Sequence, residues 1–304
     1  MSFSCSLQIS LALFMINNRQ NPEILRKPPW LKVRPPYADG CRQIRSTLSG
    51  LRLHTVCQEA ACPNMAECFQ SGTATFLILG NICTRDCLYC NVAHDQPLPV
   101  DEKEVEHLIL ATKIMNLNYV VITSVTRDDL QDGGAQAFAD CITRLRQAAP
   151  GCKIEVLIPD FRNKPGALEK VIAARPDVIN HNMEVVLPLF GGLRPQGDYH
   201  HSLQLLFRVA STPVVSKSGF MVGFGEKKED VLRLIDDLAS VSCARLTIGQ
   251  YQQPTLKHWP VAKYYHPDEF AVFKEIAYSK GFQHVEAGPL VRSSYHAARA
   301  GTFK

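Results

Sequence analysis

The sequence contains no apolar run that approaches the roughly 18 residues needed for a membrane-spanning helix. Its N-terminal stretch SLQISLALFMI is too short, and it lacks the basic flank and small-residue cleavage site of a secretory signal peptide. We therefore expect no membrane segment and a cytoplasmic location. We interpret the first residues as an extension, with Met15 as an alternative start.

An excess of charge of one sign is also missing. The 33 basic and 29 acidic side chains leave a net charge of +4, which is too mild for a dedicated nucleic-acid binder. No GxGxxG, Walker, HExxH or GxSxG motif occurs where it would be needed, which disfavours dinucleotide, nucleoside-triphosphate, zincin and serine-hydrolase chemistry. What remains is a 304-residue globular chain with 46% hydrophobic residues, enough for one large domain or two small ones.

The eleven cysteines are the most informative residues that are present. The length, the odd count and the missing signal peptide favour a reducing compartment, where clustered cysteines more often bind metal than form disulfides. Five are isolated, and we interpret them as buried or inert thiols: Cys5, Cys41, Cys141, Cys152 and Cys243. The other six form two sets of three, Cys57, Cys62 and Cys68 in CQEAACPNMAEC and Cys83, Cys87 and Cys90 in CTRDCLYC.

The spacing within each set predicts a soft metal centre. Thiolates three or four residues apart on a loop can converge on zinc or on an iron–sulfur cluster. A structural zinc site needs four ligands, and no histidine lies at the spacing that would complete a zinc finger. Three thiolates on a four-iron cluster would leave one iron open and reactive. Zinc sites and plain core cysteines are the alternatives.

After the cysteines, short β-branched runs alternate with segments of helical periodicity. In EDVLRLIDDLAS, for example, the apolar side chains of Val231, Leu234, Ile235 and Leu238 form one stripe. This alternation predicts parallel β/α units, in a barrel or a doubly wound sheet, and six units would make a partial barrel. The predicted strands cover residues 75–80, 119–125, 153–158, 177–182, 214–223 and 244–251.

Polar segments follow several of these strands, and the proline-rich segment KPPWLKVRPPYADG precedes them. SVTRDD, NHNME, GFGE and GQYQQPT stand at strand ends, where β/α barrels build active sites. The prolines favour an extended arm over the domain surface. Basic residues surround Trp30 in this arm, as either a solvated charge run or a docking site for an acidic partner: Arg26, Lys27, Lys32 and Arg34.

The second cysteine set, with an aromatic residue at Tyr89, resembles the cluster motif of the radical S-adenosylmethionine superfamily. Together with the first set, SVTRDDLQDGGA, KSGFMVGFGE, LTIGQYQQPT and GPLVRSSYHA, it resembles the lipoyl synthase family over residues 25–300. The resemblance implies an α/β fold with a partial (β/α)6 barrel over residues 75–280. Residues 1–50 would form the extension and basic arm, 51–74 the auxiliary-cluster motif, and 281–304 a C-terminal segment carrying RSSY.

The resemblance also implies a chemistry. A [4Fe–4S] cluster on Cys83, Cys87 and Cys90 would bind S-adenosylmethionine and cleave it to a 5′-deoxyadenosyl radical. That radical would remove hydrogen from carbons 6 and 8 of an octanoyl group on a carrier-protein lysine, in lipoate biosynthesis. An alkyl C–H has no usable acidity, so no acid–base constellation is expected.

The first cysteine set would then hold a second, auxiliary [4Fe–4S] cluster whose sulfides are the inserted sulfur. The family implies a serine oxygen from RSSY as the fourth ligand, and we assign Ser294 rather than Ser293. An alkoxide is a harder donor than a thiolate and should release iron more readily.

Five further side chains are expected to contact S-adenosylmethionine or to shape its pocket. Arg194 and Lys217 are the cations that would face its carboxylate. Each could instead be a satisfied core polar group, and His181 is interpreted as a core histidine. Val185, Phe224 and Gln252 depart from the usual family residues, threonine at the first and leucine at the other two. The five predicted contacts are Tyr89, Asn182, Glu184, Arg194 and Lys217.

The expected partners follow from the same resemblance. They are octanoylated lipoyl-carrier domains or glycine cleavage H protein, an electron donor such as ferredoxin or flavodoxin, and an iron–sulfur cluster carrier. The basic arm is a candidate docking site for the carrier. A two-cluster electron carrier is the alternative from another class, but its cysteines would come in fours and its chain would be small. A radical enzyme of the biotin synthase type is the alternative among enzymes, and RSSY argues against it.

Overall fold

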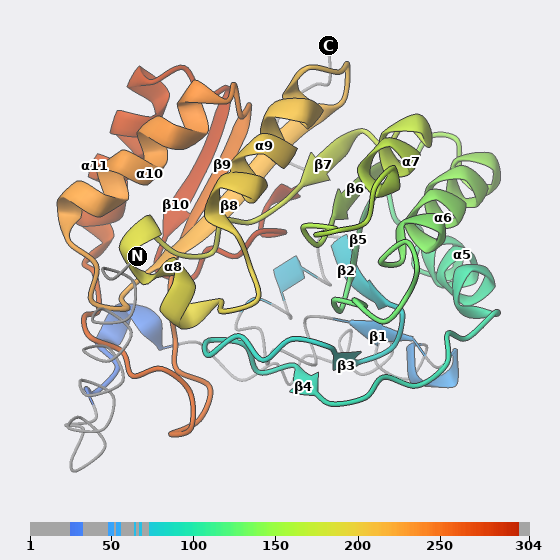
Figure 1. Ribbon diagram of the computed structural model, residues 1–304, viewed down its shortest axis with the longest axis horizontal. Helices are drawn as coiled ribbons and strands as arrows, with labels where there is room; N and C mark the ends of the chain where they lie inside the picture. The colour runs from blue at the N-terminus through green and yellow to red at the C-terminus, as the bar shows by residue number, and fades with distance from the viewer. Residues whose placement is uncertain are drawn as a thin grey trace, which may run out of the picture.

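One curved sheet of eight strands carries the fold in the computed structural model, which describes residues 25–32, 48–51, 53–55, 64, 67–68 and 73–297 (Figure 1). The strand order is β1-β2-β5-β6-β7-β8-β9-β10. The strands are β1 His54–Thr55, β2 Thr73–Ile78, β5 Tyr119–Ser124, β6 Lys153–Leu157, β7 Val178–Asn180, β8 Val215–Val222, β9 Arg245–Gln250 and β10 His284–Gly288.

Helices connect the strands and cover the outer face of the sheet. Helices α5, α6 and α7 lie along one flank, and α10 and α11 lie along the other (Figure 1). None of the described helices is long and apolar enough to cross a bilayer. The helices are η1 Pro29–Leu31, α5 Glu104–Ile114, α6 Ala135–Ala148, α7 Ala167–Ala173, α8 Leu187–Leu193, α9 Tyr199–Ala210, α10 Lys228–Ser240 and α11 Pro267–Ser279; a separate two-stranded sheet joins β3 Ile82–Cys83 to β4 Ala93–His94.

The sheet is an open, partial barrel. All neighbouring pairs from β2 to β10 are parallel, and only β1 pairs antiparallel with β2. Each of the six predicted strand ranges overlaps a strand, so the predicted parallel β/α architecture is confirmed. Strand β10 was missed: its sequence HVEAG mixes charged and small residues and has no apolar run. The C-terminal segment therefore begins by adding a seventh parallel strand to the sheet.

Two hydrophobic cores hold the helices on the sheet. One joins β2, β5 and β6 to α5–α7, and the other joins β8–β10 to α10 and α11. The predicted stripe of α10 is confirmed, because Val231, Leu234, Ile235 and Leu238 are all buried. Fully burying side chains of this size contributes about 1.5–3 kcal/mol each. The outer face of the sheet is thus the stable part of the molecule.

The inner face of the sheet is polar. Glu155 alternates along β6 with the core residues Ile154 and Val156, so its side chain points away from the helices. The Glu155 carboxylate accepts hydrogen bonds from Lys217 Nζ at 2.8 Å and from the Tyr119 hydroxyl at 2.6 Å. Burial, with the carboxylate alongside, raises the pKa of Tyr119 and keeps its proton in place. The Lys217 ammonium inside the barrel is therefore paired with the Glu155 carboxylate.

Candidate functional site

The polar segments that follow the strands gather at one edge of the sheet, as predicted. Parallel strands present their carboxyl ends at the same edge, where β/α folds place their sites. SVTRDD follows β5, NHNME follows β7, GFGE follows β8 and GQYQQPT follows β9. The loop from Cys83 to Cys90 follows β2 and joins this group.

The turn after β2 aims the cysteine loop. Leu79 takes a left-handed conformation, with φ at 68°, and its backbone N–H donates to Glu104 Oε2 at 2.8 Å. Its carbonyl accepts from Arg127 Nη1 at 3.1 Å. Gly134 lies directly against this turn, since a Cβ at that position would meet Leu79 Cδ1. Close packing against Leu79, in the turn before the cysteine loop, therefore explains the second glycine of DGGA, Gly134.

Cys83, Cys87 and Cys90 are partly buried at this edge. The backbone N–H of Arg85 donates to Cys83 Sγ at 3.4 Å, and the N–H of Cys90 donates to the Cys87 carbonyl at 3.0 Å. Burial raises the pKa of Cys87, and it raises the pKa of Cys90 to about 12. The Cys87 and Cys90 thiols therefore keep their protons until the positive charge of bound iron displaces them.

The donor set is suited to a cluster. In the part of the chain that the structure describes, no three histidine, cysteine or acidic side chains converge closely enough to hold one metal ion. A four-iron cluster needs wider spacing than a single ion, because each thiolate binds a different iron. Three soft thiolates within one eight-residue loop at the strand ends are donors of the type that such a cluster takes.

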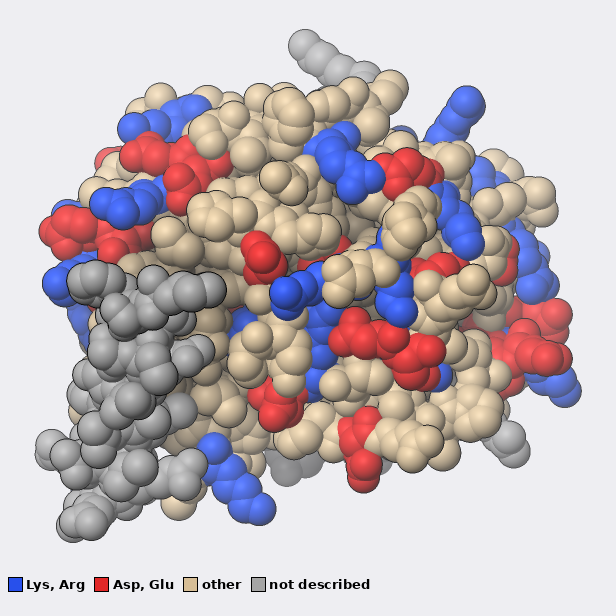
Figure 2. All heavy atoms as spheres, viewed as in Figure 1, with Lys and Arg blue, Asp and Glu red and all other residues tan. Residues whose placement is uncertain are grey.

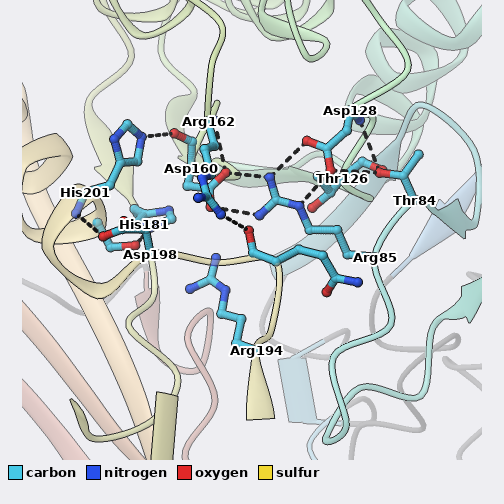
Figure 3. Close-up of polar contacts among 12 residues, drawn as sticks. Thr84, Arg85, Thr126, Asp128, Asp160, Arg162, His181, Arg194, Asp198 and His201 are labelled. Atoms are coloured by element: carbon cyan, nitrogen blue, oxygen red, sulfur yellow. Dashed lines mark hydrogen bonds and ion pairs between the residues drawn. The ribbon is translucent and has the colours of Figure 1, made fainter. Parts of the chain in front are cut away.

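The first half of the cysteine loop is held by a buried ion pair. Arg85 lies between Asp128 and Asp160, which follow β5 and β6 respectively (Figure 3). Thr84 adds a hydrogen bond from its hydroxyl to the Thr126 carbonyl at 2.9 Å. Sequence reasoning missed Arg85 and Asp160, although a charged residue inside a cysteine motif and an aspartate just after a strand were visible signals.

The second half of the loop is held by the segment after β9. His258 Nε2 lies 2.9 Å from the Cys90 carbonyl, so the ring must carry its proton there, because a carbonyl can only accept. The backbone N–H of Trp259 donates to the Leu88 carbonyl at 2.9 Å, and the Leu88 N–H donates to the Leu193 carbonyl at 3.0 Å. These residues were also missed, because their partners lie far away in the sequence.

Three of the predicted cosubstrate contacts lie together. Asn182 Nδ2 donates to Glu184 Oε1 at 3.0 Å, and Arg194 Nη1 donates to the Asn182 carbonyl at 3.0 Å. Asn182 Oδ1 is buried without a hydrogen-bond partner among the described residues. Glu184 takes a left-handed φ of 68°, and burial raises the pKa of its carboxyl. A strained backbone and an acceptor without a partner at one place are typical of ligand sites.

A small cavity of about 50 Å³ opens beside these acceptors. It is lined by Asn182 and Glu184 on one side and by Arg292 and Ser293 of the C-terminal segment on the other. Gly249 allows this approach, since a Cβ there would meet the Val291 carbonyl oxygen. The cavity therefore joins the predicted cosubstrate contacts to the RSSY segment.

The other two predicted contacts have different surroundings. Tyr89 lies edge-on to Phe224 with ring centroids 6.2 Å apart, and burial beside Glu184 raises its pKa. Lys217 is placed apart from the group, because its ammonium is already paired with Glu155 inside the barrel. His181 is a core histidine, as interpreted from the sequence, and is 1% exposed.

The three departures from the family pattern are accommodated. Val185 is fully buried in the core. Phe224 stacks on Tyr251 with centroids 4.1 Å apart. Gln252 accepts a hydrogen bond from Lys27 Nζ of the arm at 3.0 Å.

The basic arm packs beside the segment after β9. The Trp30 ring meets His266 edge-on at 4.9 Å, and a hollow of about 440 Å³ lies between residues 25–27 and 253–264. Arg34 lies outside the described residues. Acidic and basic groups are interspersed over the face shown in Figure 2, in keeping with the mild net charge.

The auxiliary set is described only in part, because Cys57 and Cys62 lie outside the described residues. The structure does bring the end of this set, around Cys68, to the C-terminal segment. Asn64 Nδ2 donates to the Leu290 carbonyl at 2.5 Å, and Glu67 accepts from the Tyr295 hydroxyl and from His296 Nε2, each at 3.0 Å.

These contacts lie on both sides of Ser294 along the chain, between residues 290 and 296. Asn64 and Glu67, the described residues of this motif that make these contacts, therefore lie beside the RSSY segment. Sequence reasoning did not predict that Asn64 and Glu67 would make these contacts, although both lie inside the cysteine motif.

Two family models match the chain. Residues 77–238 match the radical SAM superfamily, and residues 14–62 match the N-terminal domain of lipoyl synthase of the radical SAM family. The chain is 50% identical over 285 residues to a lipoyl synthase of Nitrosomonas eutropha, covering 93% of this chain and 91% of that protein. It is also 50% identical over 278 residues to a lipoyl synthase of Laribacter hongkongensis, with 90% and 88% covered.

Solved structures support the fold. Methylornithine synthase PylB aligns with a TM-score of 0.53 at 12% identity, covering 81% of each chain. Streptococcus suis SuiB bound to S-adenosylmethionine aligns with a TM-score of 0.54 at 11% identity, covering 92% of this chain and 60% of that one. At these identities the likeness concerns the fold alone.

Proposed function

This chain belongs to the lipoyl synthase family of the radical S-adenosylmethionine superfamily, and we propose that it inserts two sulfur atoms into a protein-bound octanoyl group. The sulfurs enter at carbons 6 and 8 of an octanoyl chain amide-linked to a carrier lysine. The observation that carries this proposal is the cavity between Glu184 and Ser293, which joins the edge holding one cysteine set to the segment beside the other.

Cys83, Cys87 and Cys90 hold one [4Fe–4S] cluster in this proposal, and Cys57, Cys62, Cys68 and Ser294 hold the other. The first assignment is supported by three thiols at the strand ends that do not converge on a single ion. The second is supported by the contacts of Asn64 and Glu67 with both sides of RSSY. A serine oxygen completes a set that has only three thiolates.

When bound, the first cluster and S-adenosylmethionine supply the radical that removes hydrogen, and the second cluster supplies sulfur. The chain's own residues bind and orient. Asn182 Oδ1 and the Glu184 carboxylate accept hydrogen bonds from the ammonium group of the cosubstrate, which gives Asn182 Oδ1 the donor it lacks among the described residues.

Arg194 offers its guanidinium to the cosubstrate carboxylate, and Tyr89 closes the pocket against Phe224. Lys217 stays a prediction, and its charge is already matched by Glu155.

We also propose the partners. The octanoyl group arrives on a lipoyl-carrier domain or on glycine cleavage H protein, and ferredoxin or flavodoxin donates electrons in the cytoplasm. An iron–sulfur cluster carrier restores the second cluster. The arm residues Arg26, Lys27 and Lys32 offer positive charge to an acidic carrier.

The test compares two acceptors under anaerobic conditions. Reconstituted protein is incubated with S-adenosylmethionine, reductant and either an octanoyl-lysine carrier peptide or dethiobiotin, and products are measured by mass spectrometry. We expect about eight irons per chain and two-sulfur insertion into the octanoyl peptide only. Sulfur insertion into dethiobiotin alone, or one zinc per chain without iron, would refute the proposal.

A further inference from the structure

Arg85 lies between Cys83 and Cys87, and each nitrogen of its guanidinium donates to a carboxylate. Its side chain is 4% exposed. Nε and Nη2 donate to the two carboxylate oxygens of Asp128 at 2.7 and 2.9 Å, and Nη1 and Nη2 donate to those of Asp160 at 2.7 and 2.9 Å (Figure 3). A guanidinium with two bidentate partners has almost no rotational freedom left.

Asp160 is the buried partner, with a side chain that is 0% exposed, whereas that of Asp128 is 41% exposed. Its carboxylate also accepts from the Arg162 N–H at 3.1 Å, and its carbonyl lies 2.8 Å from His201 Nε2. Burial alone would raise the pKa of Asp160, but the hydrogen bonds from Arg85 lower it to about 2. The aspartate is therefore a fixed, charged anchor just after β6.

The next residue of the loop, Asp86, is also linked to the segment that follows β6. Asp86 Oδ1 accepts from Gln196 Nε2 at 2.5 Å, and the Gln196 carbonyl accepts from Arg162 Nη1 at 2.9 Å. Two of the three residues between Cys83 and Cys87 are thus tied, directly or through one side chain, to the segment that follows β6. Meanwhile the Arg85 backbone N–H donates to Cys83 Sγ at 3.4 Å, so the anchor reaches a ligand atom.

Stability alone is a weak reason for such a pair. Desolvating two charges offsets most of their attraction, and an apolar replacement for a buried pair is often neutral or stabilising. Asp128 by itself would balance the charge of Arg85. The second, fully buried carboxylate is better explained by what it does to the loop, which is to set the distance and orientation between two cysteines.

We propose that Arg85 and Asp160 are positioning residues that hold the segment from Cys83 to Cys87 in the shape that receives the four-iron cluster. This inference rests on the proposed function of Cys83, Cys87 and Cys90 and adds how their loop is set before iron arrives. Neither side chain contacts a reacting atom.

The test uses a chain that should hold only the first cluster, with Cys57, Cys62 and Cys68 all replaced by alanine. In that background we compare Asp160→Asn, Arg85→Lys and the double variant Arg85→Gln with Asp160→Asn. The matched control is Asp177→Asn, because Asp177 pairs with Arg146 and Lys153 just before β7, at the opposite edge of the sheet. Iron per chain, the electron paramagnetic resonance spectrum of the reduced protein, and thermal unfolding of the iron-free protein are measured.

We expect the parent and Asp177→Asn to bind about four irons, and both single variants to bind less than half of that with a broadened spectrum. The double variant removes the unpaired buried charge, so its thermal unfolding should recover towards that of the parent while its iron content stays low. Recovery of thermal stability without recovery of iron content would show that the pair positions the cysteines and does not only stabilise the fold. Iron content that recovers together with thermal stability, or an Asp160→Asn variant with full iron and an unchanged spectrum, would overturn the inference.

Failure of the proposed function would look different. In that case the parent itself would bind no cluster, or would keep it after Cys87→Ala. If Asp160→Asn does not fold, Arg85→Lys still decides the question, because it keeps the positive charge and removes only the double bidentate geometry.

Discussion

The two cysteine regions are held in opposite ways. The loop from Cys83 to Cys90 is tied to the strand ends by a buried ion pair, in which the side chains of Arg85 and Asp160 are 4% and 0% exposed. The region around Cys68 is tied to the C-terminal segment by Glu67, whose side chain is 51% exposed, and by His296, which is 22% exposed.

We call the loop from Cys83 to Cys90 the preformed region and the region around Cys68 the assembled region. Breaking one partner of a buried pair leaves an uncompensated charge and costs about 3–5 kcal/mol, whereas an exposed pair contributes about 0–1 kcal/mol. The shape of the first region is therefore costly to change. The exposed Glu67 contact of the second region can open at small cost, which would suit the sulfur-donor role that we propose for its cluster.

The largest effects are expected when one cysteine is removed from each set in turn. Cys87→Ala should abolish cleavage of S-adenosylmethionine, because two thiolates do not retain the first cluster. Cys62→Ala should leave cleavage largely intact and yield 5′-deoxyadenosine without any carbon–sulfur bond. Both products are measured in one reaction by mass spectrometry. Lipoyl product from Cys62→Ala, or cleavage by Cys87→Ala, would show that the roles are wrongly assigned.

A second comparison lies within the RSSY segment. Ser294→Ala should make no lipoyl product and still cleave S-adenosylmethionine, since it removes the proposed fourth ligand of the second cluster only. Ser293→Ala is the matched control and should be milder, because Ser293 lines the cavity beside Glu184 instead. Quantifying thiolated peptide for the two variants decides between the serines, and the reverse ranking would move the ligand to Ser293.

The free energy of unfolding should depend on pH through His181, which directly follows β7. His181 is buried with Nδ1 2.9 Å from the Ile158 carbonyl and Nε2 3.0 Å from the Ser202 hydroxyl. Burial lowers the pKa of His181 from its ordinary 6.5 to about 4. The unfolded chain therefore binds this proton first, and stability that is complete above pH 6.5 should fall as the pH drops towards 4.

The loss should be on the order of 3 kcal/mol in the free energy of unfolding, measured by denaturant titration between pH 7 and pH 4. His181→Asn should flatten this dependence, and His200→Asn, on the exposed side of α9, should not. An equal slope for all three proteins would exclude His181 as the source.

The smallest effect is expected at the exposed contact of the assembled region. Glu67→Gln removes the charge that faces His296 but keeps an oxygen that can accept from Tyr295. We expect lipoyl product to fall by less than about fivefold, in line with an exposed pair worth up to about 1 kcal/mol. A loss as large as that of Ser294→Ala, in the same peptide assay, would mean that this region is also rigidly preformed.

Local sequence patterns were enough for much of the fold. The stripe of Val231, Leu234, Ile235 and Leu238 predicts α10 because helical periodicity is a local property. The six apolar runs predict strands for the same reason. Strand β10 escaped because HVEAG forms a strand only by pairing with β9, through contacts that its own composition does not reveal.

For the candidate site, spacing along the chain determined the chemistry. Three thiols within eight residues can converge on one centre, so a soft metal centre could be predicted before any fold was known. The tertiary structure alone decided what surrounds them. The partners of Arg85 lie 43 and 75 residues away, and that of Glu67 lies 228 residues away at Tyr295. Such pairs form only when parallel strands bring their carboxyl ends to one edge and the C-terminal segment returns to it, because hydrogen bonds depend on distance in space and not on separation along the chain.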